Sequence, residues 1–155
     1  EGGQITAGNS SQLSDGAAAV LVCSREAGEA NGWPILATIL DYCTSGVEPA
    51  RVMAAPIPAI ETLLGRNGLT MDDLTYVEHN EAFAAASCAI AKTCNIPDEK
   101  LNPHGGAVAI GHPLGATGAR CLMALINALR RTGGGKGIVT LCLGGGNAVA
   151  MLIEA

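Results

Sequence analysis

The chain has 155 residues and a formal net charge of −5, and aromatic residues make up only 3% of it. This length is enough for one domain with a hydrophobic core. The acidic balance argues against a nucleic-acid partner or a basic membrane-binding patch, and the scarcity of aromatic residues argues against a base-stacking surface.

Segments typical of strands and of helices alternate along the chain. After a polar, turn-rich stretch over residues 4–16, short apolar or β-branched runs predict strands over residues 17–23, 35–42, 75–78, 137–143 and 147–154. Helix formers and end signals predict helices over residues 25–31, 56–67, 82–94 and 116–131, with a long loop over 102–115. Three glycines at 144–146 join the last two strands in a hairpin. This order predicts an α/β fold with a mostly parallel sheet and one antiparallel hairpin.

The cysteines and the hydropathy pattern indicate the surroundings of the protein. Six cysteines lie at positions 23, 43, 88, 94, 121 and 142, and no two form a Cys-x-x-Cys pair of the kind that binds zinc. Several lie in apolar stretches, as reduced, buried cysteines do. No apolar run reaches the about 18 residues that span a bilayer, and the first residues do not resemble a signal peptide. We therefore expect a cytoplasmic protein with no metal site and no membrane association.

Three segments place reactive groups at boundaries between predicted elements. Residues 78–83 read Glu-His-Asn-Glu-Ala-Phe and lie between a strand and a helix. Residues 105–113 put a histidine in a Gly- and Pro-containing loop, and residues 142–146 put a cysteine at a strand end beside three glycines. A thiol, an imidazole, an amide and uncovered backbone N–H groups suit carbonyl chemistry through an oxyanion or an enolate.

Each of these features also has a purely structural interpretation. Cys142 could be an inert core cysteine, His112 a loop histidine, and Asn80 a cap of the helix that follows it. The glycines at 144–146 could be only a turn. The functional interpretation gains weight because all these features occur together, each at an element boundary where functional sites are found.

A dinucleotide cofactor is not expected. Gly111, Gly115 and Gly118 precede a predicted helix, but their spacing differs from the dinucleotide-binding fingerprint. No Asp or Glu lies between Glu99 and Glu154 to bind a ribose. The expectation is an enzyme that uses no cofactor.

In their order and spacing, the segments resemble the motifs of the thiolase family. Residues 80–83 are similar to its asparagine block, residues 105–118 to its histidine block, and residues 142–146 to its second cysteine block. Residues 6–17 are similar to the family's stretch that enters the C-terminal domain. The match runs along the whole chain.

The resemblance implies that this chain is the C-terminal half of a thiolase. Such a half is an α/β domain with a five-stranded mixed sheet covered by helices, layered against a second, similar domain. Residues 1–15 would be the end of the region before the C-terminal domain, and residues 16–155 the domain itself. The predicted helix over 116–131 agrees, since a helix that is apolar nearly all round needs cover on both sides. The N-terminal half, in the same or a separate chain, would complete a homodimer or homotetramer.

The resemblance also implies roles for the motif residues. His112 would activate the nucleophilic cysteine of the N-terminal half and donate a hydrogen bond to a thioester oxygen. Asn80 would hold a water molecule that completes this oxyanion hole. Cys142 would be the general acid and base at the α-carbon, and the backbone N–H of Gly144 would belong to a second oxyanion hole.

Two further residues are implied in substrate binding, and two depart from the family pattern. Ser11 would touch the pantetheine arm of coenzyme A, and Phe83 would line the acyl pocket. His79 stands where the family has alanine, and His104 where it has asparagine, so the polarity around the site differs there.

The function implied is reversible Claisen condensation of acyl-CoA, with two acetyl-CoA giving acetoacetyl-CoA and CoA. Two alternatives remain: a longer-chain 3-ketoacyl-CoA thiolase of fatty-acid β-oxidation, and a non-catalytic half that only binds CoA or a partner chain. A ketoacyl synthase is a weaker match, because that family uses two histidines and lacks the second cysteine block. The chain alone is predicted to be inactive, because the nucleophilic cysteine is not in it.

Overall fold

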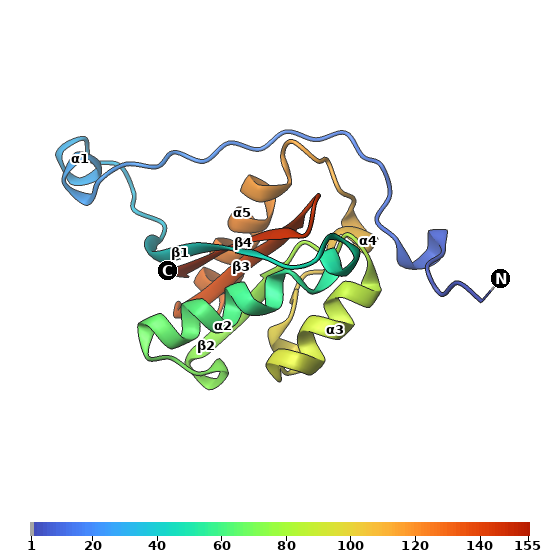
Figure 1. Ribbon diagram of the computed structural model, residues 1–155. Helices are drawn as coiled ribbons and strands as arrows, with labels where there is room; N and C mark the ends of the chain where they lie inside the picture. Colours follow the sequence, from blue (N-terminus) through green and yellow to red (C-terminus); the bar gives the residue numbers. More distant parts are fainter. Residues whose placement is uncertain (1) are drawn as a thin grey trace.

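The computed structural model describes residues 2–155, and a mixed β-sheet lies at its centre (Figure 1). The strands are β1 (Thr38–Gly46), β2 (Leu74–His79), β3 (Lys136–Leu143) and β4 (Asn147–Glu154), in the spatial order β1-β4-β3-β2. Strands β2 and β3 are parallel, whereas β4 is antiparallel to both β3 and β1. The expected mostly parallel sheet therefore has only one parallel pair, because the hairpin strand β4 lies between β3 and β1 and not at an edge.

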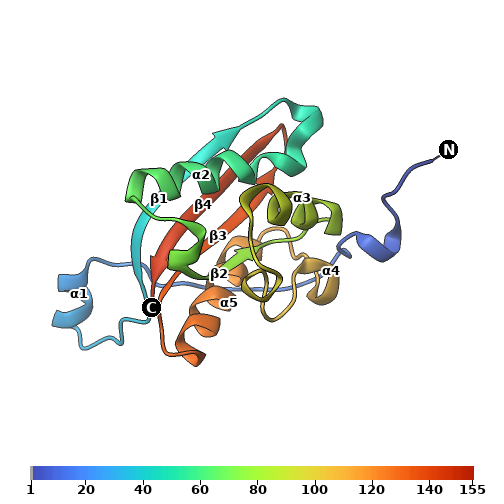
Figure 2. The same ribbon diagram turned by 90° about the horizontal axis from the view of Figure 1, so that it is seen from below.

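Helices cover both faces of the sheet. Helices α2 (Pro56–Asn67) and α3 (Ala84–Cys94) pack on one face, and α5 (Thr117–Arg131) packs on the other (Figures 1 and 2). Successive residues of β3 show the alternation of a strand, since Ile138 joins the core under α2 and α3 while Val139 joins the core under α5. The predicted layering of an α/β domain is thereby confirmed.

The ends of α2 follow from its sequence. Pro56 occupies the start of the helix, where a missing N–H has no consequence. Gly68 ends the helix in the left-handed conformation, with φ of 62°, and its N–H bonds to a carbonyl of the last turn. Buried Ala59, Ile60 and Leu63 lie on one side of the helix and meet the sheet. The helix has the predicted bounds of residues 56–67.

The short remaining elements lie in connections. They comprise α1 (Arg25–Ala30), α4 (Ala107–Ile110) and the 3₁₀ turns Ala7–Asn9, Pro49–Ala54, Met71–Asp73 and Asp98–Lys100. Helix α4 was not anticipated in the loop over residues 102–115. No helix within residues 2–155 has both the length and the apolar character needed to cross a membrane.

The predicted strand over residues 17–23 is wrong, and within residues 2–155 the sheet has four strands where five were expected. This segment is extended but joins no strand, and it runs along the α5 side of the molecule (Figure 1). Leu21 and Val22 are 70% and 66% exposed. An apolar run indicates a tendency to be buried, but a strand forms only where another strand is available to bond it. On the side of β2 away from β3, the described residues 2–155 form one isolated bridge, between Val77 and Leu101.

Candidate active site

The asparagine and cysteine motifs meet at the carboxyl ends of the neighbouring strands β2 and β3. His79 at the end of β2 is aligned with Thr140 of the parallel strand β3, and the Asn80 N–H donates to the Thr140 carbonyl at 3.1 Å. Cys142 follows two residues later on β3. The carboxyl ends of parallel strands are where α/β folds place their ligand sites.

The histidine motif reaches the same place from another part of the chain. The amide Nδ2 of Asn80 lies 3.2 Å from Nε2 of His112, although 32 residues separate them. Asn80 is buried and His112 is half-buried. The structure thus brings together two of the residues predicted to act on one substrate oxygen.

The hydrogen-bond partners of His112 indicate its tautomer. Its Nδ1 lies 2.7 Å from the Thr117 hydroxyl oxygen, and that hydroxyl donates to the Pro113 carbonyl at 2.9 Å. Because the hydroxyl proton points to Pro113, the oxygen accepts from Nδ1–H. Nε2 then carries the lone pair and accepts from the Asn80 amide.

A fourth polar side chain, Arg120 of α5, contacts this group. Its Nη2 donates to Oδ1 of Asn80 at 3.0 Å, and its Nη1 lies 3.8 Å from the carboxylate of Glu78. The sequence analysis missed Thr117 and Arg120 as site residues. A signal was present, because they are among the few polar residues of a helix that is otherwise almost entirely apolar.

Burial and charge set the protonation of this group. Burial lowers the pKa of His112, and the positive charge of Arg120 lowers it further, so the imidazole is neutral near pH 7. Burial raises the pKa of the Glu78 carboxyl to about 7, an effect that Arg120 opposes and Glu81 strengthens. Burial also raises the pKa of the Cys142 thiol, against a smaller opposing backbone hydrogen bond. The site therefore presents a neutral base and a protonated thiol.

The loop over residues 10–12 contacts the asparagine and histidine motifs. The Ser11 N–H donates to the Ala82 carbonyl at 2.9 Å, and Ser10 forms an isolated bridge with Phe83. The His112 N–H donates to the Gln12 carbonyl. Ser11 and Phe83, the two predicted substrate-binding residues, therefore lie on adjoining segments beside the histidine motif.

Gly144 and Cys142 lie apart from the hydrogen-bonded group. Gly144 is exposed in the turn between β3 and β4, where a β-carbon at its position would meet no atom within 4 Å. Its backbone is accordingly open to a ligand. Within residues 2–155 no hydrogen bond joins the Cys142 side chain to Asn80 or His112, so these residues share an edge of the sheet but do not form one bonded network.

The two departures from the family pattern have different environments. His79 is fully buried, and its Nδ1 lies 2.8 Å from the hydroxyl of Ser87 on α3. Burial lowers the pKa of His79 to about 4. His104 is exposed on a turn. Within residues 2–155, no group of three or more His, Cys, Asp or Glu side chains is arranged to hold a metal ion.

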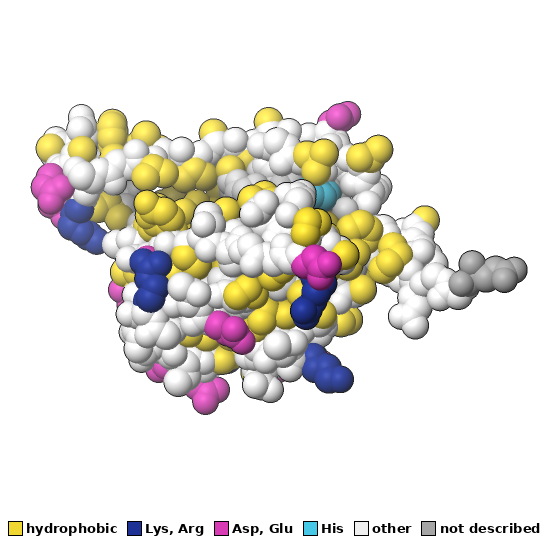
Figure 3. Space-filling model, viewed as in Figure 1, with side chains coloured by type: hydrophobic (Ala, Val, Ile, Leu, Met, Phe, Trp, Pro, Cys, Tyr) yellow, Lys and Arg dark blue, Asp and Glu magenta, His cyan; other side chains and the backbone are white. Residues whose placement is uncertain are grey.

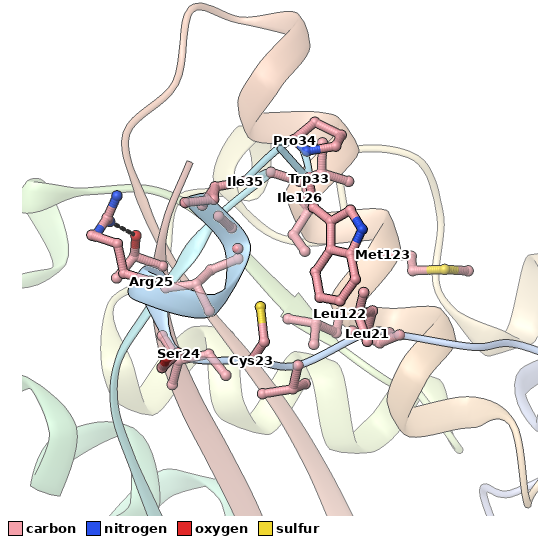
Figure 4. A pocket seen from close by; sticks show the side chains of 18 of the residues that line it. Leu21, Cys23, Ser24, Arg25, Trp33, Pro34, Ile35, Leu122, Met123 and Ile126 are labelled. Carbon is pink, nitrogen blue, oxygen red and sulfur yellow. Dashed lines mark hydrogen bonds between the residues drawn. The ribbon is translucent and has the colours of Figure 1, made fainter. Parts of the chain in front are cut away.

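A large hollow lies away from this site. A cavity of about 520 Å³ lies between the N-terminal segment and α5, and none of the predicted site residues lines it. Leu21, Trp33, Leu122, Met123 and Ile126 gather around it (Figure 4), and Figure 3 shows apolar side chains along the opening.

Comparison with known proteins identifies matching families and relatives. The thiolase C-terminal domain family matches residues 33–155, and the thiolase N-terminal domain family matches residues 1–26. The acetyl-CoA acetyltransferase of Syntrophomonas wolfei is 45% identical over 157 residues, covering 100% of this chain and 40% of the relative. The chain thus spans about two fifths of the length of the curated relatives that it matches.

Solved structures agree with this assignment. The Bacillus anthracis acetyl-CoA acetyltransferase has a TM-score of 0.94 and 43% identity, covering 97% of this chain and 38% of that one. The Acat5 thiolase of Ascaris suum, solved in complex with coenzyme A, has a TM-score of 0.89 and 36% identity, covering 98% and 39%. The motifs, the fold and these matches together show that the chain belongs to the thiolase family.

Proposed function

We propose that this chain supplies the C-terminal part of the catalytic site of a thiolase that interconverts two acetyl-CoA with acetoacetyl-CoA and CoA. The observation that carries the proposal is the Asn80–His112 contact of 3.2 Å at the sheet edge where Cys142 also lies. The similar proteins named acetyl-CoA acetyltransferase support acetyl-CoA as the substrate. We propose residues 16–155 as the catalytic C-terminal domain.

In this proposal, His112 and Asn80 act on the oxygen of the thioester. The neutral imidazole takes the proton of the nucleophilic thiol of the N-terminal half, and its protonated Nε2 then donates to the thioester oxygen. Asn80 holds the second donor, a water molecule. Fixed donors are needed because the α-proton of a thioester is only weakly acidic, so that the enolate oxygen must be stabilised as its charge develops.

Cys142 moves the proton at the α-carbon. In cleavage its thiol protonates the carbon of the departing acetyl-CoA enolate, and in condensation its thiolate removes the same proton. The raised thiol pKa suits proton donation at neutral pH. The N–H of Gly144 would stabilise the oxyanion on the acyl group being transferred, while Ser11 contacts the pantetheine arm and Phe83 lines the acyl pocket.

The test is an assay of condensation and of thiolysis with this chain joined to a thiolase N-terminal half. Replacing Cys142 by Ser should lower both rates by about a hundredfold or more, because a hydroxyl is a far weaker acid at neutral pH. Cys88→Ser, the same exchange at an exposed cysteine of α3, serves as the matched control. An undiminished rate in Cys142→Ser would refute the assigned role.

Chain length separates the proposed substrate from the alternative. A higher kcat/KM for long-chain 3-ketoacyl-CoA than for acetoacetyl-CoA would favour a degradative thiolase of β-oxidation. Absence of turnover after addition of the N-terminal half would favour a half that only binds CoA or a partner chain. We also propose a cytoplasmic homodimer or homotetramer, which sedimentation and cell fractionation would test.

A further inference from the structure

The first turn of α5 contacts both polar side chains of the proposed oxyanion hole. The Thr117 hydroxyl oxygen lies 2.7 Å from Nδ1 of His112, and Arg120 donates to Oδ1 of Asn80 at 3.0 Å. Thr117 and Arg120 are three residues apart and therefore lie on the same side of the helix. Thr117 is buried, and the Arg120 side chain is 16% exposed.

We propose that Thr117 and Arg120 are positioning residues that hold His112 and Asn80 in the hydrogen-bonded arrangement in which Nε2 of His112 is the unprotonated base. The proposal rests on the function proposed above, and deepens it. Neither residue need touch the substrate, because each acts through the side chain that does.

The role of Thr117 follows from the direction of its hydroxyl proton. The hydroxyl donates to the Pro113 carbonyl and can therefore only accept from His112. This contact keeps the proton of neutral His112 on Nδ1 and leaves Nε2 available as the base. With the proton on Nε2, the ring could not take a proton from a nucleophilic thiol at that atom.

The role of Arg120 follows from the two ends of an amide. An asparagine side chain can rotate by half a turn, which would exchange its oxygen and nitrogen. A guanidinium only donates, so Arg120 selects the orientation with Oδ1 toward itself and Nδ2 toward His112. The opposite orientation would direct two donors at each other.

A role in stability alone does not account for Arg120. Its Nε and Nη1 find no hydrogen-bond partner within residues 2–155, and the Glu78 oxygen at 3.8 Å is too far for a hydrogen bond. A buried cation with incomplete partners usually costs stability. The contact with Asn80 is therefore best explained by its effect on the site.

The test of Thr117 uses the chain joined to its N-terminal half, labelled with ¹⁵N in histidine. The His112 signals are assigned as those that disappear in His112→Ala. Wild type and Thr117→Ser should show Nδ1–H and an unprotonated Nε2. Thr117→Val, which keeps the shape without the hydroxyl, should show a mixture of tautomers and a kcat for thiolysis about tenfold lower.

The test of Arg120 is independent of Thr117. Arg120→Met should lower kcat about tenfold and leave KM for CoA within about twofold, because the loss falls on the transition state. Arg120→Lys, which retains a charged donor, should recover part of the lost rate. This arm remains informative if Thr117→Val does not fold, which circular dichroism would reveal.

The outcomes separate the inference from the proposed function. An unchanged His112 tautomer in Thr117→Val with an unchanged kcat overturns the role of Thr117, and an unchanged kcat in Arg120→Met overturns that of Arg120. A third outcome is that wild type has no thiolase activity but holds His112 in one tautomer, and that Thr117→Val shows a mixture of tautomers. This outcome would support the positioning contact and refute the thiolase function.

Discussion

At the scale of single residues, the state of His112 depends on its neighbours. Burial and the charge of Arg120 both lower its pKa, so the imidazole remains neutral and can accept a proton. Glu78, which faces Arg120 from β2, partly offsets that charge when it is ionised. The chemistry of the histidine is therefore controlled from α5 and β2, and not from its own loop.

The first prediction concerns the acid limb of the pH–rate profile. Arg120→Met removes a nearby positive charge and so stabilises the protonated imidazolium of His112. The variant should therefore have a higher His112 pKa. Because the base must be neutral, the acid limb of kcat/KM for thiolysis should move to higher pH. Measurement between pH 5 and 8 would show it, with Arg120→Lys as the control that keeps the charge. A limb at the wild-type position would contradict this prediction.

At the scale of elements, the contact between β2 and α3 includes a buried histidine. His79 lies at the end of β2 and contacts Ser87 on α3, and burial lowers its pKa to about 4. Because the folded pKa is below that of the unfolded chain, neutral His79 contributes stability above about pH 6.5. That contribution is lost as the pH falls toward 4.

The second prediction is that His79→Gln reduces the acid sensitivity of folding. The free energy of unfolding of wild type should fall between pH 6.5 and 4, at up to about 1.4 kcal/mol per pH unit from this residue. Glu78, whose pKa is raised, acts in the opposite direction, so the difference between wild type and variant is the informative quantity. Urea unfolding at several pH values measures it, and parallel pH curves would rule out this role of His79.

The packing of α5 on β3 depends on a glycine. A β-carbon on Gly137 would lie 2.7 Å from the Leu125 side chain and 2.9 Å from the Tyr76 carbonyl. The third prediction is that Gly137→Ala destabilises the fold by about 1–3 kcal/mol, since the close-packed interior has no room for it. Gly65→Ala, at an exposed position of helix α2 where a β-carbon would meet no atom within 4 Å, should instead be neutral or stabilising. Equal melting temperatures for the two variants would contradict this prediction.

At the scale of the whole molecule, an apolar surface is open on the α5 side. Leu21, Val22 and Trp33 are 70%, 66% and 44% exposed, and they border the cavity of about 520 Å³. Exposed apolar surface of this extent marks an interaction site. The thiolase N-terminal domain family matches residues 1–26, which supports an N-terminal half as the partner of this surface.

The fourth prediction is that the isolated chain is inactive and binds an apolar fluorescent dye. Joining the N-terminal half should restore turnover and reduce dye fluorescence, because the nucleophile is supplied and the apolar surface is covered. The double variant Leu21→Ser and Val22→Ser should lower dye binding by the isolated chain. Strong dye binding that persists in the active, joined protein would show that this surface is not covered by that half.

The sequence alone determined the features that depend on neighbouring residues. Hydrophobic spacing and end signals located α2, α5 and the final hairpin, and three local motifs predicted Asn80, His112 and Cys142 as site residues. Only the tertiary structure decided the place of β4 between β3 and β1 and the absence of residues 17–23 from the sheet. It alone decided the contact of Arg120 with Asn80 across 40 residues. Strand pairing and buried polar contacts depend on which distant segments meet, and periodicity along the chain carries no record of that.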